Sequence, residues 1–181
     1  MKDFILKLTR HAIEIYVRSG KIIPKPKEYP KELSEKHGVF VTLFKKPREL
    51  RGCIGLPFPE KPLIEGIIEA AVDVCQDPRF PPLDKDELKD VFIEVSILSE
   101  PKLIKGKSKD CKKCIELGKD GLIIKRGYQG GLFLPQVPVE QGWNLDEYLE
   151  NLCYKAGMSG DAWKDEECEI FKFQTEVFSE E

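Results

Sequence analysis

The chain has 181 residues, of which 41% are hydrophobic and 34% are charged. This composition is typical of a globular protein and excludes the collagen-like, disordered and membrane classes. No run approaches the roughly 20 consecutive apolar residues of a membrane-spanning helix, and the first residues lack the basic and apolar regions of a signal peptide. We therefore expect a cytoplasmic protein that does not enter a membrane.

The formal net charge is −3, whereas dedicated nucleic-acid-binding proteins carry a basic excess. Basic residues nevertheless concentrate in residues 102–126. A solvated surface is the simpler interpretation of this segment, and a site for an anionic partner is the alternative. The abundance of lysine and glutamate is similar to the usage of thermophilic proteins.

The N-terminal region predicts a helix followed by an extended segment. Apolar residues of 4–18 recur at steps of three and four, which predicts an amphipathic helix with Asp3 as N-cap and Gly20 just beyond its end. Residues 21–36 are rich in proline, lysine and glutamate, so we expect an extended surface segment, or part of a small lobe, rather than regular core structure there.

Two strand-like runs, 38–45 and 50–56, flank residues 46–49 and predict an antiparallel hairpin. If Lys45 pairs with Leu50, Cys53 lies opposite Thr42. Residues 62–75 predict a mostly apolar helix that packs on the sheet.

Further along the chain, short helices alternate irregularly with strands. The predicted elements are a capping box at Asp84 and Glu87, a strand over 91–98, a short helix over 108–117, a hairpin of 121–126 and 132–134 around the glycine-rich turn 127–131, a capped helix from Asn144 to Gly157, and a strand over 169–178. There is no regular βαβα alternation. We therefore predict an α+β fold with an antiparallel or mixed sheet flanked by helices.

The six cysteines are expected to be thiols rather than a disulfide framework. Cys111 and Cys114 have the spacing of half a zinc site. No second pair with this spacing follows, and the sequence has only two histidines. The pattern argues against structural zinc, and we predict neither a metal nor a cofactor.

The strand around Cys53 carries the strongest chemical signal. A period of two puts Arg51, Cys53 and Gly55 on one face, where the arginine would favour a thiolate. Gly52 and Gly55 would leave backbone N–H groups open to a ligand or a partner chain. The alternative is a buried structural cysteine between glycines that packing requires. His37 lies too far along the neighbouring strand to act as the base of a Cys–His pair.

A series of short blocks, in order over nearly the whole chain, resembles the AMMECR family (Alport syndrome, midface hypoplasia and elliptocytosis chromosomal region protein family), in its archaeal and bacterial members. The hallmark block is Leu50-Arg-Gly-Cys-Ile-Gly55, which contains the RGCIG motif. The other blocks are residues 38–43, 77–80, 94–101, 118–122, 134–137 and 155–157.

The resemblance implies a single domain over residues 1–181, one compact unit with a larger lobe that holds both termini and a smaller lobe. The hallmark strand would lie by the cleft between the lobes. The resemblance implies no established activity. Prokaryotic relatives are fused to, or encoded near, a Memo-type protein and a radical SAM protein, which suggests these as partners. Cys75, Cys111 and Cys114 depart from the family pattern.

The same blocks supply a set of candidate site residues. Cys53 is a candidate nucleophile or thiol ligand, and Gly52 and Gly55 would offer backbone groups beside it. The other candidates are Arg51 and Arg79 as clamps for an anion, Asp77 as the group that orients an arginine, and Gln136 and Lys155 as polar contacts. Each has a structural alternative, such as a cation in the last turn of a helix for Lys155.

Two functions are nearly level. One is a thiol-dependent enzyme, or an enzyme component, that acts on a small anionic or peptide substrate. The other is a non-catalytic binding or adaptor module that works with the Memo-type and radical SAM partners. Nucleic-acid binding through residues 102–126 ranks well behind, and whether the protein is an enzyme stays open.

Overall fold

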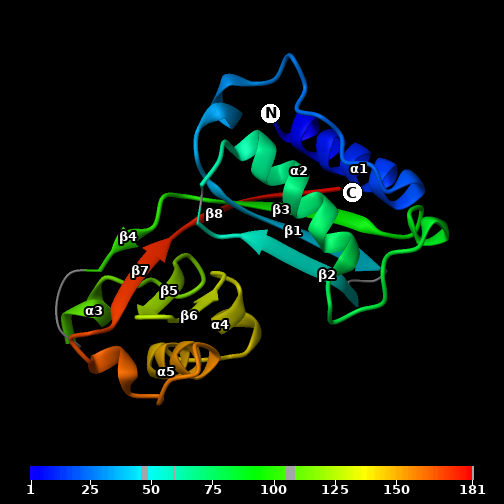
Figure 1. Cartoon of the computed structure of the whole chain (residues 1–181). Helices are drawn as coiled ribbons and strands as arrows, with labels where there is room; N and C mark the ends of the chain where they lie inside the picture. Colours follow the sequence, from blue (N-terminus) through cyan, green and yellow to red (C-terminus); the bar gives the residue numbers. More distant parts are fainter. Residues whose placement is uncertain (46–48, 59, 105–108, 181) are drawn as a thin grey trace. The chain divides into compact units, whose positions relative to one another are not determined.

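The computed structural model describes residues 1–45, 49–58, 60–104 and 109–180 (Figure 1). The predicted turn at 46–49, apart from its last residue, and the first residue of the helix predicted over 108–117 lie outside the described residues. No helix within the described ranges is both long enough and apolar enough to cross a bilayer.

The chain divides into two units, one of residues 1–98 and 176–181 and one of residues 99–175. The elements of the first unit are α1 (Lys2–Ser19), η1 (Lys31–Ser34), β1 (Gly38–Lys45), β2 (Glu49–Leu56), α2 (Leu63–Asp73), η2 (Val74–Gln76), η3 (Lys85–Glu87), β3 (Phe92–Leu98) and β8 (Thr175–Ser179). Its sheet has the order β2-β1-β3-β8, and β1 pairs antiparallel with β2 and β3. Helices α1 and α2 cover one face of this sheet (Figure 1). The core lies between them because alternate β1 residues, Val39, Val41 and Leu43, point to the helices and are fully buried.

The second unit holds the other sheet and a smaller core. Its elements are β4 (Lys102–Leu103), α3 (Lys109–Lys113), β5 (Gly121–Arg126), β6 (Gln129–Phe133), α4 (Val137–Glu140), α5 (Leu145–Lys155), η4 (Ala162–Lys164) and β7 (Glu169–Phe173). The sheet order is β4-β7-β5-β6, with antiparallel pairing throughout. The apolar face of α5 packs on β5 and β6 and buries Tyr148, Leu149 and Leu152. The α+β prediction is therefore confirmed. One domain with two lobes stays a prediction.

The predicted N-terminal helix is confirmed, but its cap is different. Met1 occupies the cap position, so Asp3 lies in the first turn, where its charge faces the positive end of the helix dipole. Gly20 ends the helix with φ 69°, as a left-handed C-cap requires. The extended surface segment predicted over 21–36 is wrong in part, because η1 forms there and its Leu33 is fully buried.

The hairpin forms with a different register near its turn. Lys45 pairs with Glu49 rather than Leu50, and a bulge leaves Arg51 without a partner on β1. This extra residue restores the register, so Cys53 does lie opposite Thr42. The bulge also interrupts the strict alternation that had placed Arg51 on the same face as Cys53.

Two predictions in the C-terminal half are wrong in detail. The strand predicted over 169–178 is two strands, β7 and β8, which belong to different sheets. The glycine-rich turn 127–131 is shorter than predicted, because β6 already begins at Gln129. Gly131 lies in this strand, and close packing explains why the residue there is a glycine. A Cβ at this position would lie 3.1 Å from the backbone nitrogen of Ala156, at the end of the adjacent helix.

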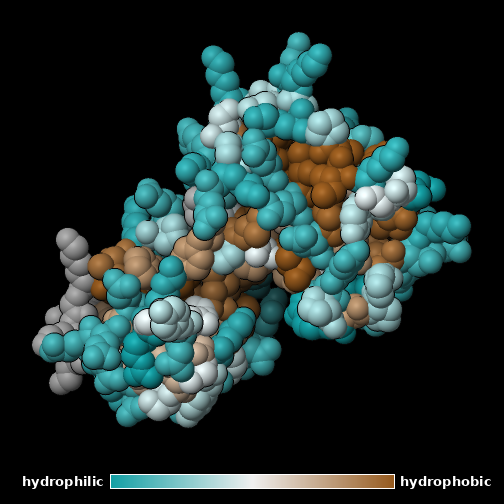
Figure 2. All heavy atoms as spheres, in the orientation of Figure 1, coloured by the Kyte–Doolittle hydropathy of each residue, from teal (hydrophilic) through white to brown (hydrophobic). Residues whose placement is uncertain are grey.

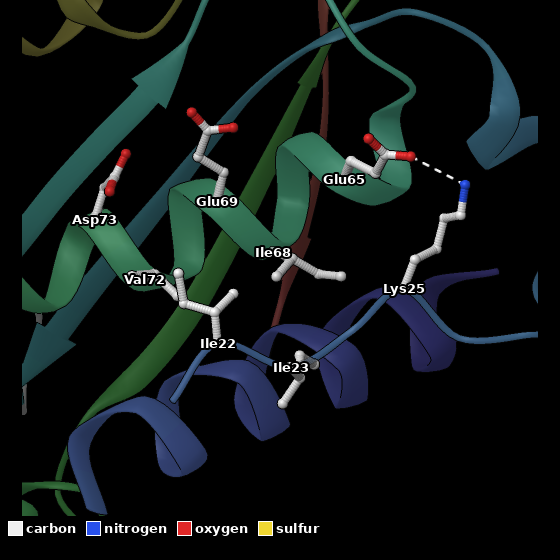
Figure 3. Close-up of a pocket in the computed structure, with 8 residues that line it drawn as sticks. All are labelled: Ile22, Ile23, Lys25, Glu65, Ile68, Glu69, Val72 and Asp73. Atoms are coloured by element: carbon white, nitrogen blue, oxygen red, sulfur yellow. Dashed lines mark hydrogen bonds and ion pairs between the residues drawn. The ribbon is translucent and has the colours of Figure 1, made fainter. Parts of the chain in front are cut away.

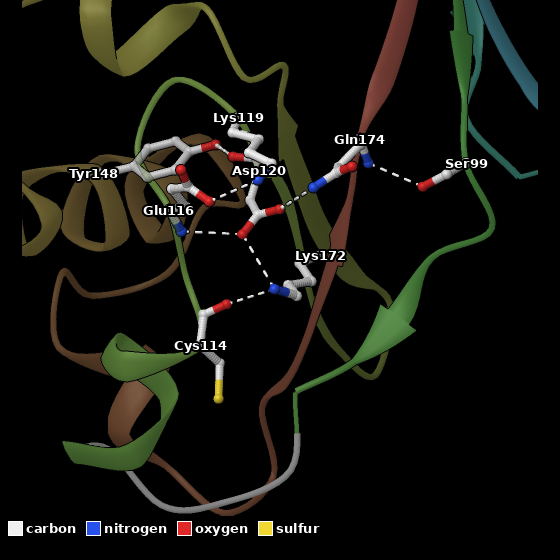
Figure 4. Close-up of polar contacts among 8 residues, drawn as sticks. All are labelled: Ser99, Cys114, Glu116, Lys119, Asp120, Tyr148, Lys172 and Gln174. Atoms are coloured by element: carbon white, nitrogen blue, oxygen red, sulfur yellow. Dashed lines mark hydrogen bonds and ion pairs between the residues drawn. The ribbon is translucent and has the colours of Figure 1, made fainter.

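A buried carboxylate, Asp120, organises the polar interior of the second unit (Figure 4). Its Oδ2 accepts hydrogen bonds from the Glu116 N–H at 3.0 Å and from Lys172 Nζ at 3.2 Å, and its Oδ1 accepts one from Gln174 Nε2 at 3.2 Å. Burial alone would raise the pKa of Asp120, but these bonds outweigh it, so the pKa lies below its ordinary value. Lys172 also donates to the Cys114 carbonyl at 2.6 Å. The cluster therefore ties the segment after α3 to β7.

Candidate functional site

The predicted site residues divide between the two units. Arg51, Gly52, Cys53 and Gly55 on β2, with Asp77 and Arg79 just after η2, belong to the first unit. Gln136 and Lys155 belong to the second unit. Each group is described by itself.

Asp77 joins the segment after η2 to strand β2. Its side chain is 1% exposed. Oδ2 accepts from the Cys53 N–H at 2.8 Å and from the Arg79 guanidinium at 2.6 Å, while Oδ1 accepts from Arg79 Nε at 3.0 Å. The Arg79 guanidinium and the backbone N–H groups of Cys53 and Arg79 lower the pKa of Asp77 to about 2, against the opposing effect of burial. Asp77 is therefore a carboxylate at neutral pH.

Arg79 is fixed in direction although it is open to solvent. Besides Asp77, its guanidinium donates to the Cys53 carbonyl at 2.9 Å and lies 5.7 Å from the centroid of the Phe80 ring. Its side chain is nevertheless 56% exposed. These contacts agree with the expectation that Asp77 orients an arginine. Substrate binding by either residue stays a prediction.

The same contacts cover part of the sheet edge. Strand β2 is an edge strand, so half of its backbone groups face away from β1. At Cys53 these outward groups are already used, because the N–H donates to Asp77 and the carbonyl accepts from Arg79. The backbone at Cys53 is therefore not open to a partner chain, and the expectation of open N–H groups at Gly52 and Gly55 stays a prediction.

The Cys53 thiol is half-buried and receives a hydrogen bond from the Thr42 hydroxyl at 3.2 Å. Burial raises its pKa, and Asp77 and Glu94 raise it further, while Thr42 and Arg79 act in the opposite direction without outweighing burial. The thiol is therefore neutral at physiological pH. The expectation that Arg51 favours a thiolate here is wrong: the nearby cation is Arg79, and the pKa moves up.

Arg51 turns instead toward the segment that follows η2. Its guanidinium makes two bonds to the Glu87 carboxylate, at 2.9 and 2.8 Å, and one to the Pro81 carbonyl at 3.0 Å. Its side chain is 10% exposed. Protein acceptors bind Nε and Nη2 of Arg51 as they do in Arg79, but the Arg51 side chain is far less exposed than that of Arg79. The structure therefore favours a structural role for Arg51 over the predicted anion clamp.

The two glycines of the motif make room for neighbouring groups. A Cβ on Gly52 would lie 3.1 Å from the Val74 carbonyl oxygen, so this glycine admits the backbone of η2. A Cβ on Gly55 would lie 2.2 Å from Cδ1 of Phe40, whose ring covers that position. Both contacts support the packing explanation for the glycines.

The candidates in the second unit are Gln136 and Lys155. Gln136 is half-buried at the start of α4. Lys155 is exposed in the last turn of α5, and its Nζ lies 4.3 Å from the centroid of the Phe133 ring, a cation–π contact. Their roles as polar contacts to a ligand stay predictions.

Two residues beside Cys53 were missed. Thr42 and Glu94 face each other in the β1–β3 register, next to the thiol. For Thr42, the predicted hairpin register already indicated that it lies opposite Cys53. Glu94 stands in another predicted strand, and its pairing with β1 cannot be read from the local sequence.

Cys111 and Cys114 differ from each other in solvent accessibility: Cys111 is buried and Cys114 is exposed. Burial raises the pKa of Cys111. Across residues 1–45, 49–58, 60–104 and 109–180 no group of three or more His, Cys, Asp or Glu side chains is arranged to hold a metal ion.

The cysteines should differ in their rates of alkylation. At about pH 7.5 we expect iodoacetamide to label exposed Cys114 first, Cys53 more slowly and Cys75 last, because the thiolate is the reacting species. Cys75 is buried, and burial raises its pKa to about 12. Peptide-resolved mass spectrometry measures the rates. If Cys53 reacts as fast as Cys114 below about pH 7, it is an activated thiolate and the binding interpretation below loses its support.

The comparisons with known proteins agree on one family. The AMMECR1 family model matches residues 6–178. A protein of Thermococcus onnurineus is 48% identical over 99% of this chain and 90% of its own length, and one of Methanopyrus kandleri is 48% identical over 99% and 88%. The crystal structure of the uncharacterized protein PH0010 from Pyrococcus horikoshii superposes with a TM-score of 0.93 at 47% identity and covers 98% of this chain and 90% of its own. This chain therefore belongs to the AMMECR1 family.

Proposed function

We propose that this protein is a binding module in which Arg79 captures the carboxylate or phosphate group of a small anionic ligand or of a peptide. One observation carries the proposal: the Arg79 side chain is more than half exposed, yet Asp77 and the Cys53 carbonyl hold its guanidinium in one orientation. A planar guanidinium that is already oriented loses little conformational freedom when it binds an anion. Arg51 stabilises this arrangement, because its bonds to the Pro81 carbonyl and to Glu87 fix the segment that follows Arg79.

Binding is favoured over thiol catalysis by the surroundings of Cys53. The raised pKa keeps the thiol neutral, and its hydrogen-bond partner is the Thr42 hydroxyl, which is not a base at neutral pH. The histidine nearest in sequence, His37, has its ring nitrogens 3.1 Å from the Leu98 carbonyl and 3.3 Å from a Glu35 carboxylate oxygen. The enzyme hypothesis therefore ranks second. The Memo-type and radical SAM partners stay a prediction, and a peptide of such a partner is one form the ligand can take.

The test is an NMR titration of the arginine Nε–Hε signals with two probes, inorganic phosphate and a short acetylated peptide that ends in a free carboxylate. We expect saturable shifts at Arg79. We expect Arg79→Lys to weaken the binding of both ligands by about tenfold, because the orientation that Asp77 and the Cys53 carbonyl give to the guanidinium is lost while the charge remains. Cys53→Ser should leave the affinity within about twofold, since a neutral thiol contributes little charge.

Arg18→Lys is the matched control, because Arg18 is an exposed arginine in the last turn of α1. Its affinity should equal that of the unchanged protein. Equal binding by the Arg79→Lys variant would overturn the proposal. Loss of binding in Cys53→Ser, with Arg79→Lys unaffected, would favour the thiol-dependent alternative.

A further inference from the structure

A groove of about 510 Å³ lies between α2 and the segment that follows α1 (Figure 3). Its apolar lining comes from Ile68 and Val72 of α2 and from Ile22 and Ile23 of the segment. Ile22 is 64% exposed, so the groove is open to solvent. Figure 2 shows hydrophobic surface over the region of α1 and α2. None of the lining residues belongs to the Asp77–Arg79 site.

One edge of the groove is acidic. Glu65, Glu69 and Asp73 occupy every fourth position of α2 and line the groove. They extend over about 12 Å at 1.5 Å per residue. In Figure 3 the side chains of Glu69 and Asp73 leave the same side of the helix, away from Ile22.

The acidic edge is only partly neutralised by the protein. Lys25 pairs with Glu65 at 3.0 Å, and Lys61 pairs with Glu69. Within the described part of the chain Asp73 makes no ion pair, and burial and the neighbouring Glu69 raise its pKa. A cation from outside would therefore stabilise the charged form of Asp73.

We infer that this groove binds a basic amphipathic helix of a partner protein. Apolar side chains of that helix would cover Ile22 and reach the floor of the groove, where Ile68 and Val72 are 5% and 7% exposed. Its lysines or arginines would pair with Asp73 and with Glu69, whose carboxylate also binds Lys61. The two parallel rows on α2, apolar and acidic, repeat with the helical period and so match a helix with apolar and basic rows of the same period. A small ligand fits less well, because small-molecule sites enclose most of their ligand whereas Ile22 stands open. This site uses other residues and the opposite ligand charge from the proposed function.

The test uses fluorescence anisotropy with a labelled model helix of about 15 leucine and lysine residues, long enough to be helical, with leucine at steps of three and four. The second probe has the same composition in an order without an apolar face. We expect the amphipathic peptide to bind with one-to-one stoichiometry and the scrambled peptide to bind at least about tenfold more weakly. Asp73→Lys and Ile22→Ser should each weaken binding by about tenfold.

Two matched variants control for charge and for exposed apolar surface. Glu28→Lys makes the same charge change as Asp73→Lys, at an exposed position outside the groove lining. Val139→Ser is the control for Ile22→Ser, because both side chains are 64% exposed. Both should bind within about twofold of the unchanged protein. Absence of binding, or equal weakening by Glu28→Lys and Asp73→Lys, would overturn the inference. Displacement of the peptide by an equimolar alkylamine would overturn it too, in favour of a small-amine site.

Discussion

Replacing Arg51 by methionine is expected to lower the free energy of unfolding by about 3 kcal/mol, the range found when one partner of a buried ion pair is removed. The Arg51 side chain is 10% exposed, and its guanidinium is bonded to both oxygens of Glu87 and to the Pro81 carbonyl. Methionine fills the space of the side chain but leaves that carbonyl without its donor and the carboxylate with Lys45 as its remaining cation. Urea unfolding followed by circular dichroism measures the change.

Arg126→Met is the matched control, because Arg126 also forms an ion pair, with Asp165 at 3.1 Å, but the Asp165 side chain is 57% exposed. Loss of Arg126 should cost less than about 1 kcal/mol in stability, as for other exposed pairs. If Arg51→Met is as stable as Arg126→Met, the first arginine of the motif is not structural and its role as an anion clamp returns.

Arg51→Met should also change the stability of the protein at acid pH. The bonds from Arg51, followed by those from Lys45 and the Asp84 N–H, lower the pKa of Glu87 below its ordinary value of 4.5, against the opposing effect of burial. A carboxylate with a lowered pKa stabilises the fold above its unfolded pKa, and the stabilisation is lost as the pH falls toward the folded pKa. The unchanged protein should therefore lose stability below about pH 4.5, and Arg51→Met should lose less over the same interval. A steeper loss in the variant would contradict this assignment.

The sequence predicts local structure well where one periodicity dominates. The apolar spacing of α1 and α2, the capping box at Asp84 and Glu87, and the pairing of Thr42 with Cys53 all follow from local patterns, and the structure confirms them. The bulge at Arg51 does not follow from a local pattern, because a bulge depends on what the extra residue can reach.

The roles of the site residues depend on contacts between distant parts of the chain. Arg51 and Glu87 are 36 residues apart, and the sequence marks Glu87 only as part of a capping box. The family resemblance grouped Arg51, Cys53, Asp77 and Arg79 with Gln136 and Lys155 as one candidate site, and the structure places the first four in the same unit. It did not show which arginine is buried, and that difference separates the structural residue from the candidate binding residue.

The last glycine of the motif offers the second large effect. Gly55→Ala is expected to lower the free energy of unfolding by about 2 kcal/mol, as overpacking does in other proteins. The added Cβ would lie 2.2 Å from Cδ1 of Phe40 and 2.3 Å from its Cγ. Cγ is bonded to Cβ of Phe40, so rotation of the ring about the Cβ–Cγ bond does not move Cγ away. Either the backbone of β1 must shift or Phe40 must adopt another rotamer. Gly66→Ala is the control, since a Cβ at Gly66 meets Val39 at an ordinary 3.4 Å and alanine favours the helix.

A double-mutant cycle with Phe40→Ala separates packing from function at Gly55. If the glycine serves to seat the Phe40 ring, Gly55→Ala should cost less than about 0.5 kcal/mol in the Phe40→Ala background, and the difference is the coupling energy. If instead Gly55→Ala leaves stability unchanged but weakens anion binding at Arg79, the glycine serves ligand access. The first outcome would leave the RGCIG motif as a scaffold: Arg51 and both glycines hold the segment and the ring in place, and the Cys53 backbone anchors Asp77. The group presented to a ligand would then be Arg79, outside the motif.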